Sequence, residues 1–264
     1  MDLQLKGKTA LVSGSTQGIG FAIAQRLLEE GATVIINGRS DGKIAEAVKK
    51  LQQAVNGANV SGVAADFAKA EEVSALLEKV PEVDIVVNNA GIFEPKPFAD
   101  ITDEEWLRFF EVNVLSGIRL SRHYFPQMLA KNWGRIIFIS SESSIMTPDE
   151  MIHYGMTKTA QLAVSRGLAE LTKNTAVTVN SVLPGPTKSE GVNEFVRQLA
   201  IAQNVSAAEA EADFFRTMRP SSLIQRFADV SEIASLVAYV ASPLAAAVNG
   251  AALRADGGLV RSIL

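Results

Sequence analysis

Short apolar runs alternate with longer amphipathic stretches along most of the chain. The runs at residues 9–13 and 84–88 are typical of strands buried on both faces of a parallel sheet. Between such runs, apolar residues recur three or four positions apart, which predicts helices. The pattern therefore predicts an α/β fold with helices on both faces of a parallel sheet. The predicted strands are residues 9–13, 33–37, 60–65, 84–88, 134–140, 176–182 and a short seventh strand within 250–258.

The predicted helices complete this alternation and leave one segment without a sheet partner. Thr102 is the expected N-cap of one helix, with Glu105 as its capping-box partner, and Ser231 is the expected cap of the last helix. Residues 188–220 predict one or two helices, which we interpret as a cover over a site. The chain shows no repeat or linker, so one domain is expected over residues 1–264. The predicted helices are residues 21–30, 41–55, 71–80, 103 to about 132, one that begins near 154, and 232–241.

A glycine-rich turn joins the first predicted strand to the first helix. Gly14, Gly18 and Gly20 have the spacing G-x-x-x-G-x-G, which differs from the G-x-G-x-x-G of most dinucleotide-binding folds. Backbone amides and the helix dipole at such a turn favour a pyrophosphate, and side chains would block its approach. The alternative is a tight turn in which Gly18 and Gly20 serve only helix–strand packing.

The end of the second predicted strand bears on the choice of coenzyme. NAD-binding proteins usually place an acid there, on the ribose 2′-hydroxyl, whereas this strand ends in Asn37, Gly38 and Arg39. A guanidinium can pair with the 2′-phosphate of NADP, which an acid would repel. We therefore predict a preference for NADP(H), with NAD(H) as the alternative coenzyme. The competing interpretation of Arg39 is an ordinary exposed loop charge.

Tyr154 and Lys158 are four residues apart at the start of a predicted helix, so both side chains lie on one face. A free phenol has a pKa of roughly 10, and an adjacent ammonium stabilises the phenolate and lowers that pKa. Ser141 follows the fifth predicted strand, at the edge where open α/β sheets bind ligands. Together these residues indicate acid–base chemistry; taken alone, the pair is also compatible with a surface Tyr and Lys on an amphipathic helix.

Two asparagine features lie close to this predicted edge. The run from Asn88 to Gly91 after the fourth strand supplies polar edges beside a ligand crevice, unless it is a plain turn. Asn113 lies inside the long predicted helix, where asparagine is a weak helix former. One use for it is a carbonyl opened to hold a water, and the competing explanation is a polar residue on an exposed face.

Composition excludes several classes of protein. The 264 residues carry a net charge of −4 without a basic cluster, which argues against a nucleic-acid binder. Cysteine is absent, so disulfide scaffolds and thiolate chemistry are excluded, and we predict no metal site. The polar N-terminus argues against a signal peptide, and the lack of a long apolar run argues against a membrane span. A soluble cytoplasmic protein is expected.

These motifs occur in the order and approximate places typical of one family, and nearly the whole chain is covered. The glycine turn, the Asn88–Gly91 run, Asn113, Ser141 and the Tyr154–Lys158 pair resemble the short-chain dehydrogenase/reductase family. The resemblance implies a Rossmann-type, doubly wound sheet of seven parallel strands in order 3-2-1-4-5-6-7, in a three-layer α/β/α domain. It also implies hydride transfer between NAD(P)(H) and an alcohol/carbonyl pair such as a 3-oxoacyl thioester, ketone, sugar or polyol.

The resemblance also assigns roles to individual residues. Tyr154 would exchange a proton with the substrate oxygen, Lys158 would lower the pKa of Tyr154 and bind the nicotinamide ribose, and Ser141 would polarise the substrate oxygen. Asn113 would hold a water that continues a proton path from Lys158. The positions that match coenzyme contacts in the family are Gly14, Thr16, Gln17, Ile19, Arg39, Asp66, Phe67, Asn88, Ala90, Tyr154, Lys158, Pro184, Gly185 and Thr187.

Some residues depart from the family pattern or leave their role open. Glu142, directly after Ser141, would disfavour an anionic substrate and raise the pKa of Tyr154 if it faced the site; the favoured interpretation is that it points into solvent. His153 is expected to be structural, with a substrate contact as the alternative. The apolar C-terminus, residues 259–264, would suit a subunit interface. A homodimer or homotetramer is therefore expected, with a small-molecule carbonyl or alcohol as substrate.

Two other functions are compatible with the same fold. A catalytically silent NADP-binding sensor or scaffold would use the nucleotide site alone, but such proteins usually lack the Tyr–Lys pair that this chain retains. An epimerase or dehydratase would use the same pair. Those enzymes tend to carry a larger C-terminal substrate domain, whereas this chain ends soon after its seventh predicted strand.

Overall fold

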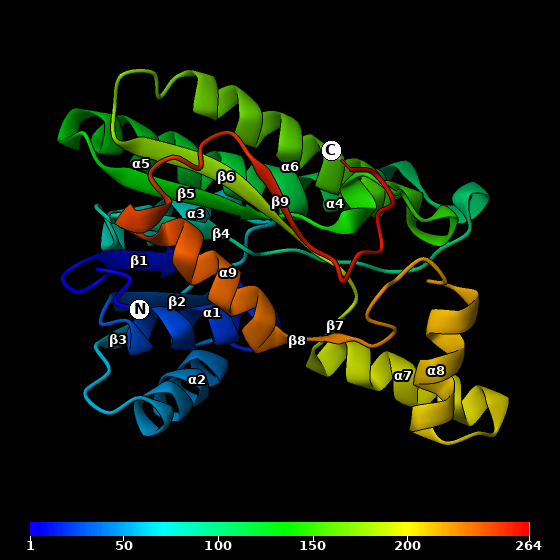
Figure 1. The fold of residues 1–264 in the computed structure, drawn as a ribbon. Coiled ribbons are helices and arrows are strands. Elements are labelled where there is room, and N and C mark those ends of the chain that lie inside the picture. Colours follow the sequence, from blue (N-terminus) through cyan, green and yellow to red (C-terminus); the bar gives the residue numbers. More distant parts are fainter. Residues whose placement is uncertain (264) are drawn as a thin grey trace.

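A seven-stranded parallel sheet forms the centre of the molecule in the computed structural model, which describes residues 1–263. Its order, β3-β2-β1-β4-β5-β6-β9, is the predicted one, with β9 as the seventh strand (Figure 1). Thr9 pairs with Thr33 on one side of β1, and Ala10 pairs with Ile85 on the other. The predicted Rossmann-type fold is therefore confirmed. The strands are β1 Thr9–Val12, β2 Thr33–Gly38, β3 Val60–Ala64, β4 Ile85–Asn88, β5 Gly134–Ile139, β6 Val177–Pro184 and β9 Ala252–Ala255.

Helices cover both faces of the sheet and enclose two hydrophobic cores. Helices α1, α2 and α9 contribute to the core on one face, and α3, α5 and α6 contribute to the core on the other (Figure 1). Because both faces are covered, the strands are buried along most of their length, which explains their apolar runs. The helices are α1 Gly18–Glu29, α2 Asp41–Ala54, α3 Ala70–Lys79, α4 Asp103–Phe110, α5 Ser116–Lys131, α6 Ile152–Glu170, α7 Glu190–Gln203, α8 Ala207–Thr217 and α9 Val230–Ala241.

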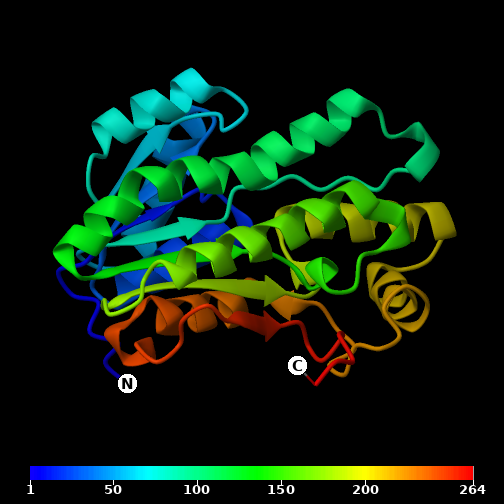
Figure 2. The same ribbon diagram turned by 90° about the horizontal axis from the view of Figure 1, so that it is seen from above.

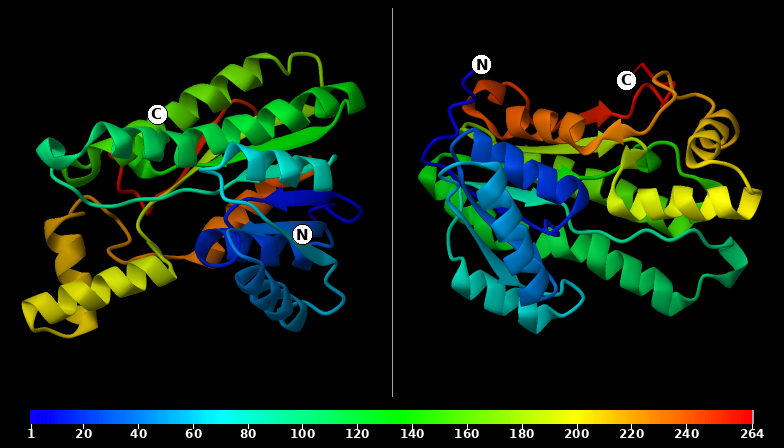
Figure 3. Two further views of the ribbon diagram at one scale, coloured as in Figure 1. Left: turned by 180° about the vertical axis from the view of Figure 1, so that it is seen from behind. Right: turned by 90° about the horizontal axis from the view of Figure 1, so that it is seen from below.

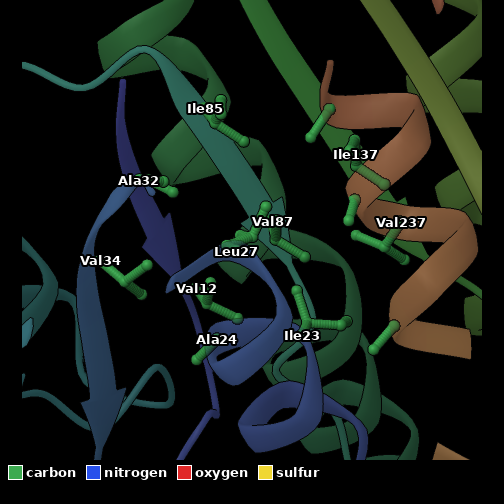
Figure 4. Close-up of a cluster of buried hydrophobic side chains, with 14 of the residues drawn as sticks. Val12, Ile23, Ala24, Leu27, Ala32, Val34, Ile85, Val87, Ile137 and Val237 are labelled. Carbon is green, nitrogen blue, oxygen red and sulfur yellow. The ribbon is translucent and has the colours of Figure 1, made fainter. Parts of the chain in front are cut away.

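The first helix is fixed against the sheet directly behind the glycine turn. Ile23 and Leu27 of α1 are fully buried and point toward Val12 and Val87 of the sheet (Figure 4). Val237 brings α9 against the same cluster. Fully burying side chains of this size contributes roughly 1.5–3 kcal/mol each. The N-terminus of α1 is thereby held at the carboxyl end of β1.

The predicted helix over residues 103–132 is interrupted in its middle. Thr102 and Glu105 form the predicted capping box at the start of α4. Residues Glu111–Leu115 form a π-helical turn that contains Asn113, and α5 continues beyond it. Such turns occur frequently at functional sites, because the wider turn displaces backbone groups from their usual hydrogen bonds.

The segment predicted as a cover is a helical hairpin beyond the carboxyl ends of the strands. Helices α7 and α8 stand apart from the two helix layers (Figures 2 and 3). A two-stranded parallel sheet, β7 Thr187–Lys188 with β8 Ala228–Asp229, brackets the hairpin, and the sequence pattern gave no indication of it. The predicted cap at Ser231 is wrong, since Asp229 is the N-cap of α9 and accepts a hydrogen bond from Ser231 N at 2.8 Å. Asp229, two residues before Ser231, is better placed to accept hydrogen bonds from the free amides at the start of α9.

The C-terminal residues are only partly available for an interface. Leu259 and Val260 are buried within the chain itself, whereas Ile263 is 94% exposed. Leu264, the last residue of the predicted apolar stretch, lies outside the described residues. Within residues 1–263, no helix combines the length and the hydropathy that crossing a membrane would require.

Candidate active site

The glycine turn is built by hydrogen bonds from neighbouring strands. Gly14 adopts a left-handed φ of +59°, and its N–H donates to Asn37 Oδ1 at 3.1 Å. Asn89 Nδ2 donates to the carbonyl oxygens of Ser13 and Gly14 at 3.0 and 2.8 Å. A Cβ at Gly20 would overlap this amide and lie 2.5 Å from the Gly14 carbonyl oxygen, so only glycine fits. Ser13, Asn37 and Asn89 hold the turn in place.

The start of α1 presents free backbone amides to this turn. Gln17 is the N-cap, with extended backbone, and within residues 1–263 no side chain caps it. The first turn of the helix contains no acidic residue. Free N–H groups and the positive end of the helix dipole form a site for an anion such as a pyrophosphate.

The residues expected near the adenosine lie along the edge formed by β2, β3 and β4. Arg39 is exposed just beyond β2, and a Cβ at Gly38 would lie 2.5 Å from the Thr16 methyl group. The Phe67 side chain is buried in the core, and its carbonyl oxygen accepts a hydrogen bond from Arg119 Nη1 at 3.1 Å. Asn88 Oδ1 is buried and has no hydrogen-bond partner among the described residues. The Asn88 side chain faces α5, where its Nδ2 donates to Ser121 Oγ at 3.3 Å, and it does not line the cavity.

The predicted acid–base pair, Tyr154 and Lys158, lies on the first turns of α6. Tyr154 and Lys158 line one cavity, and Lys158 Nζ lies 5.5 Å from the centroid of the Tyr154 ring. Lys158 Nζ donates to the Ile139 carbonyl oxygen at 2.9 Å, at the end of β5, which fixes the amine under the sheet edge. Ser141, two residues further on, lines the same cavity and its Oγ accepts from Ser143 N at 3.1 Å.

Burial sets the proton affinities of this pair. It raises the pKa of Tyr154 well above its usual value, and the Glu142 carboxylate adds to the rise, while a hydrogen bond with Ser141 opposes it. Burial lowers the pKa of Lys158 to about 8, which the Glu142 charge opposes. Burial and the Glu142 charge therefore outweigh the hydrogen bond with Ser141, so the pKa of Tyr154 is raised rather than lowered.

Asn113 ties the π-helical turn to the rest of the site. It is fully buried, so the exposed-face explanation is wrong. Its Nδ2 donates to the Ile92 carbonyl oxygen and to Thr157 Oγ1, both at 3.0 Å, and its Oδ1 accepts from Ile92 N at 2.7 Å. Its own carbonyl oxygen accepts from Gln161 Nε2 at 2.5 Å. That carbonyl is the one expected to hold a water.

A single cavity of about 420 Å³ joins the turn to the acid–base pair. It runs from Ile19 and Asn89 beside the glycine turn to Ser141, Tyr154 and Lys158. The segment after β6 forms one wall. Pro184, Gly185 and Thr187 line it there, as expected of the segment over the nicotinamide.

Comparison with known proteins agrees with this geometry. A family model described as short chain dehydrogenase matches residues 8–200. The chain belongs to the short-chain dehydrogenase family. The prediction of an oxidoreductase acting on alcohol or carbonyl groups is thereby confirmed at the level of the family.

Several relatives and solved structures of short-chain dehydrogenases resemble the whole chain. An uncharacterized oxidoreductase of Bacillus subtilis, YvaG, is 53% identical over 263 residues and covers 100% of both chains. The D-beta-hydroxybutyrate dehydrogenase of Cupriavidus necator is 32% identical, over 97% of this chain and 99% of its own. The structure of L-sorbose reductase from Gluconobacter frateurii, complexed with NADPH and L-sorbose, has a TM-score of 0.94 at 29% identity and covers 100% of both chains.

The surroundings of Glu142 and His153 bear on the interpretations that the sequence left open for these two residues. Glu142 is buried and lines the cavity, so the interpretation that it points into solvent is wrong. His153 is buried against the rings of Trp106 and Phe109, with centroid distances of 5.9 and 4.0 Å, which agrees with a structural role. The direction of a side chain after a buried strand depends on the turn that follows, here the 3₁₀ turn Glu142–Ser144.

Sequence reasoning missed two residues of the site. Gln161 is buried and bridges Lys158 to Asn113, since its Oε1 accepts from Lys158 Nζ at 3.4 Å while its Nε2 donates to the Asn113 carbonyl oxygen. The available signal was the place of this polar residue three positions after Lys158, on the helix face that carries Tyr154 and Lys158. Arg219 lines the cavity from beyond α8 and pairs with Glu150 at 2.9 Å, a contact across 69 positions that no local pattern reveals.

The α7–α8 hairpin contributes the outer wall of the cavity. Phe214 packs against Phe195, Phe215 and Phe227, with centroid distances of 5.0–6.1 Å among the four rings in contact, and these rings form a core of their own. The cavity-lining residues from this region are Val192, Phe195, Phe214, Met218, Arg219 and Phe227.

Proposed function

We propose that this short-chain dehydrogenase uses NADP(H) to reduce an uncharged carbonyl compound with an apolar body, such as a ketone or a 3-oxoacyl thioester. This function is supported by the single cavity that extends from the start of α1, which can bind an anion, to Ser141, Tyr154 and Lys158. Its outer wall is aromatic and aliphatic, which favours such substrates over sugars or polyols. A charged group on the substrate would lose its hydration against the same apolar wall, so anionic compounds are disfavoured.

The residues present fit a nicotinamide dinucleotide. The turn at Gly14 and Gly20 allows a ligand to approach closely, and the first amides of α1 are free. A Cβ at Gly91 would lie 3.4 Å from Asn113 Oδ1 and 3.5 Å from Lys158 Nζ, so this backbone stays open beside the catalytic amine. When bound, the coenzyme would supply the hydride.

The chain's own residues would then handle the proton and the substrate oxygen. Ser141 donates a hydrogen bond to the carbonyl oxygen and polarises it, and Tyr154 gives its proton to the same oxygen. The ammonium of Lys158 stabilises the phenolate that remains. Gln161 accepts a buried hydrogen bond from Lys158 and donates another to the Asn113 carbonyl oxygen. The proposed proton path would run from Lys158 along these two hydrogen bonds. The further proposed coenzyme contacts are Gly14, Thr16, Gln17, Ile19, Asp66, Ala90 and Thr187.

NADPH oxidation across a panel of carbonyl compounds tests this function. We expect turnover with apolar ketones and acyl thioesters, and weaker turnover with sugars and with keto acids. A protein that binds NADPH but oxidises it with no carbonyl would instead be a silent sensor. The presence of Ser141, Tyr154 and Lys158 in one cavity speaks against that alternative.

Arg39 provides a test of the coenzyme. The Arg39→Asp variant should shift the ratio of catalytic efficiencies from NADPH toward NADH by about tenfold to 100-fold, since each tenfold corresponds to about 1.4 kcal/mol and a charge-assisted pair is replaced by repulsion. The exposed Lys43→Asp variant, with the same charge change on α2, is the control. An unchanged ratio for Arg39→Asp would remove Arg39 from the coenzyme site.

The pKa of Lys158 sets the expected upper pH limit of carbonyl reduction. Since its pKa is about 8, the ammonium that stabilises the phenolate is lost as pH rises through that value. The efficiency kcat/KM should then fall by about tenfold per pH unit. A profile that is flat from about pH 6 to about pH 10 would show that the charge of Lys158 is not required.

The assembly and location of the protein are proposed from its surface. Phe98 and Leu107 are exposed on the segments around α4, at 63% and 69%, and would suit a contact between subunits of a homodimer or homotetramer. A cytoplasmic location remains a proposal from the sequence. The α7–α8 hairpin is proposed as the substrate cover because it forms the outer wall of the cavity.

A further inference from the structure

Glu142 is a buried acid in direct contact with a proposed catalytic group. Its side chain is 6% exposed and lies in the cavity lining beside Ser141. Glu142 Oε2 shares a short hydrogen bond with Ser141 Oγ, and backbone hydrogen bonds within the Glu142–Ser144 turn hold the carboxyl group. The carboxyl group is therefore fixed in one orientation, against the hydroxyl that polarises the substrate.

Burial favours the neutral form of Glu142, whereas the neighbouring groups oppose it. The titratable and charged groups that face it are Tyr154 and Lys158 on α6 and Arg219 beyond α8. Arg219 is itself paired with Glu150, so it offsets the cost of a second buried carboxylate only in part. Burial raises the pKa of Glu142, and the hydrogen bond with Ser141 and the charge of Arg219 oppose the rise.

The protonation state of Glu142 decides where the single hydrogen of the Ser141 hydroxyl points. Beside a carboxylate, Ser141 must donate to Glu142 Oε2, and its hydrogen is then unavailable to a substrate. Beside a carboxylic acid, Glu142 donates to Ser141 Oγ. That oxygen also accepts from Ser143 N at 3.1 Å, so both of its lone pairs are used and its hydrogen points away from Glu142, to the side of the cavity where Tyr154 lies.

We propose that Glu142 is a positioning residue that keeps a proton and thereby turns the Ser141 hydroxyl toward the substrate carbonyl oxygen. The inference rests on the proposed function. Glu142 neither gains nor loses its proton during a turnover. The hydride adds to the carbonyl carbon, the proton comes from Tyr154, and Ser141 only donates a hydrogen bond to the oxygen.

The pH profile of carbonyl reduction separates this role from a merely structural one. In the wild type, kcat/KM should fall as rising pH removes the proton of Glu142, in addition to the fall due to Lys158. The Glu142→Gln variant, whose carboxamide still donates to Ser141 Oγ, should keep activity within about tenfold at low pH and lose that part of the fall. Asp149→Asn, at an exposed acid outside the cavity lining, should retain it. Identical profiles for the wild type and Glu142→Gln would overturn the proposal.

A second readout needs no turnover. Infrared difference spectra of the wild type against Glu142→Gln at neutral pH should show a protonated-carboxyl stretching band that the variant lacks. Absence of this band would overturn the proposal even if the enzyme is active. If no carbonyl is reduced but the band is present, the proposed function fails while the protonated Glu142 stands, so the two failures are distinguishable.

The pH dependence of folding stability provides a further test of the raised pKa of Glu142. The folded state binds the Glu142 proton more tightly than the unfolded chain, because its pKa is raised. The free energy of unfolding should therefore decrease as pH rises above the ordinary pKa of a glutamate, toward the raised value. Glu142→Gln should lack this decrease, and an equal decrease in both proteins would contradict a raised pKa.

Discussion

The Tyr154→Phe variant should lose carbonyl reduction by about 10²–10⁴-fold in kcat, the usual contribution of a positioned acid. The phenol is the only group in our account that gives its proton to the substrate oxygen, and Ser141 and Lys158 cannot replace it from their observed positions. The ring of Tyr154, which contacts the Phe93 ring at a centroid distance of 6.3 Å, is preserved in phenylalanine. NADPH affinity should therefore remain nearly unchanged, and the measurement is steady-state kinetics beside a fluorescence titration of NADPH.

Tyr239→Phe is the matched control for this variant. Tyr239 is 38% exposed on α9, away from the cavity lining, so removing its hydroxyl should leave kcat unchanged. If Tyr154→Phe retained kcat within threefold of the wild type, Tyr154 would have no part in proton transfer. A simultaneous loss of NADPH binding would instead show that the phenol holds the coenzyme.

Gly20→Ala should damage both stability and coenzyme binding. The added methyl would overlap Asn89 Nδ2 and lie 2.5 Å from the Gly14 carbonyl oxygen, both of them fixed by hydrogen bonds. Overpacking of this kind costs about 1–3 kcal/mol. Because the strain acts on the turn that approaches the pyrophosphate, NADPH should bind at least about tenfold more weakly, which corresponds to about 1.4 kcal/mol. Thermal unfolding and isothermal titration measure the two effects.

Gly167→Ala is the control, because this glycine lies inside α6 and an added Cβ would meet no atom within 4 Å. Alanine is favoured over glycine in a helix by about 1 kcal/mol, so this variant should be slightly more stable and bind NADPH normally. A Gly20→Ala protein with wild-type stability and wild-type NADPH affinity would show that the turn does not hold the coenzyme as proposed.

The raised pKa of Tyr154 favours one direction of the proposed reaction. A phenol that keeps its proton at neutral pH is ready to donate it to a carbonyl oxygen. To oxidise an alcohol, the same phenol must first lose that proton in a cavity that disfavours the phenolate. Carbonyl reduction should therefore extend to lower pH than alcohol oxidation.

The sheet could be predicted from the sequence because its signals are local. Strands covered by helices on both faces need apolar residues along their whole length, and the turns between strands and helices carry glycine or capping residues. The same locality explains the one wrong cap: Asp229 and Ser231 are both capping residues, and only the path of the chain after β8 selects between them. The β7–β8 pair has two residues in each strand, too few to show a period.

The site was only partly predictable, because its chemistry depends on contacts between distant segments. The Tyr154–Lys158 pair follows from helical spacing, and Ser141 follows from the end of a strand. The burial of Glu142 and the bond between Gln161 and Asn113, 48 positions apart, arise only when α6 packs on the π-helical turn and the α7–α8 region closes the cavity. The sequence also led us to expect a lowered pKa for Tyr154, because the spacing of residues does not show how strongly burial desolvates the phenol.

The decisive measurement is the transfer of deuterium from NADPH labelled at C4 of the nicotinamide, with enzyme and coenzyme in equal amounts and an apolar ketone in excess. We expect the label from one face of the ring to appear at the carbinol carbon of the product, one deuterium for each coenzyme oxidised, and transfer by Tyr154→Phe to be slower by about 10²–10⁴-fold. NADPH that binds at the glycine turn but passes no label to any ketone would contradict the account.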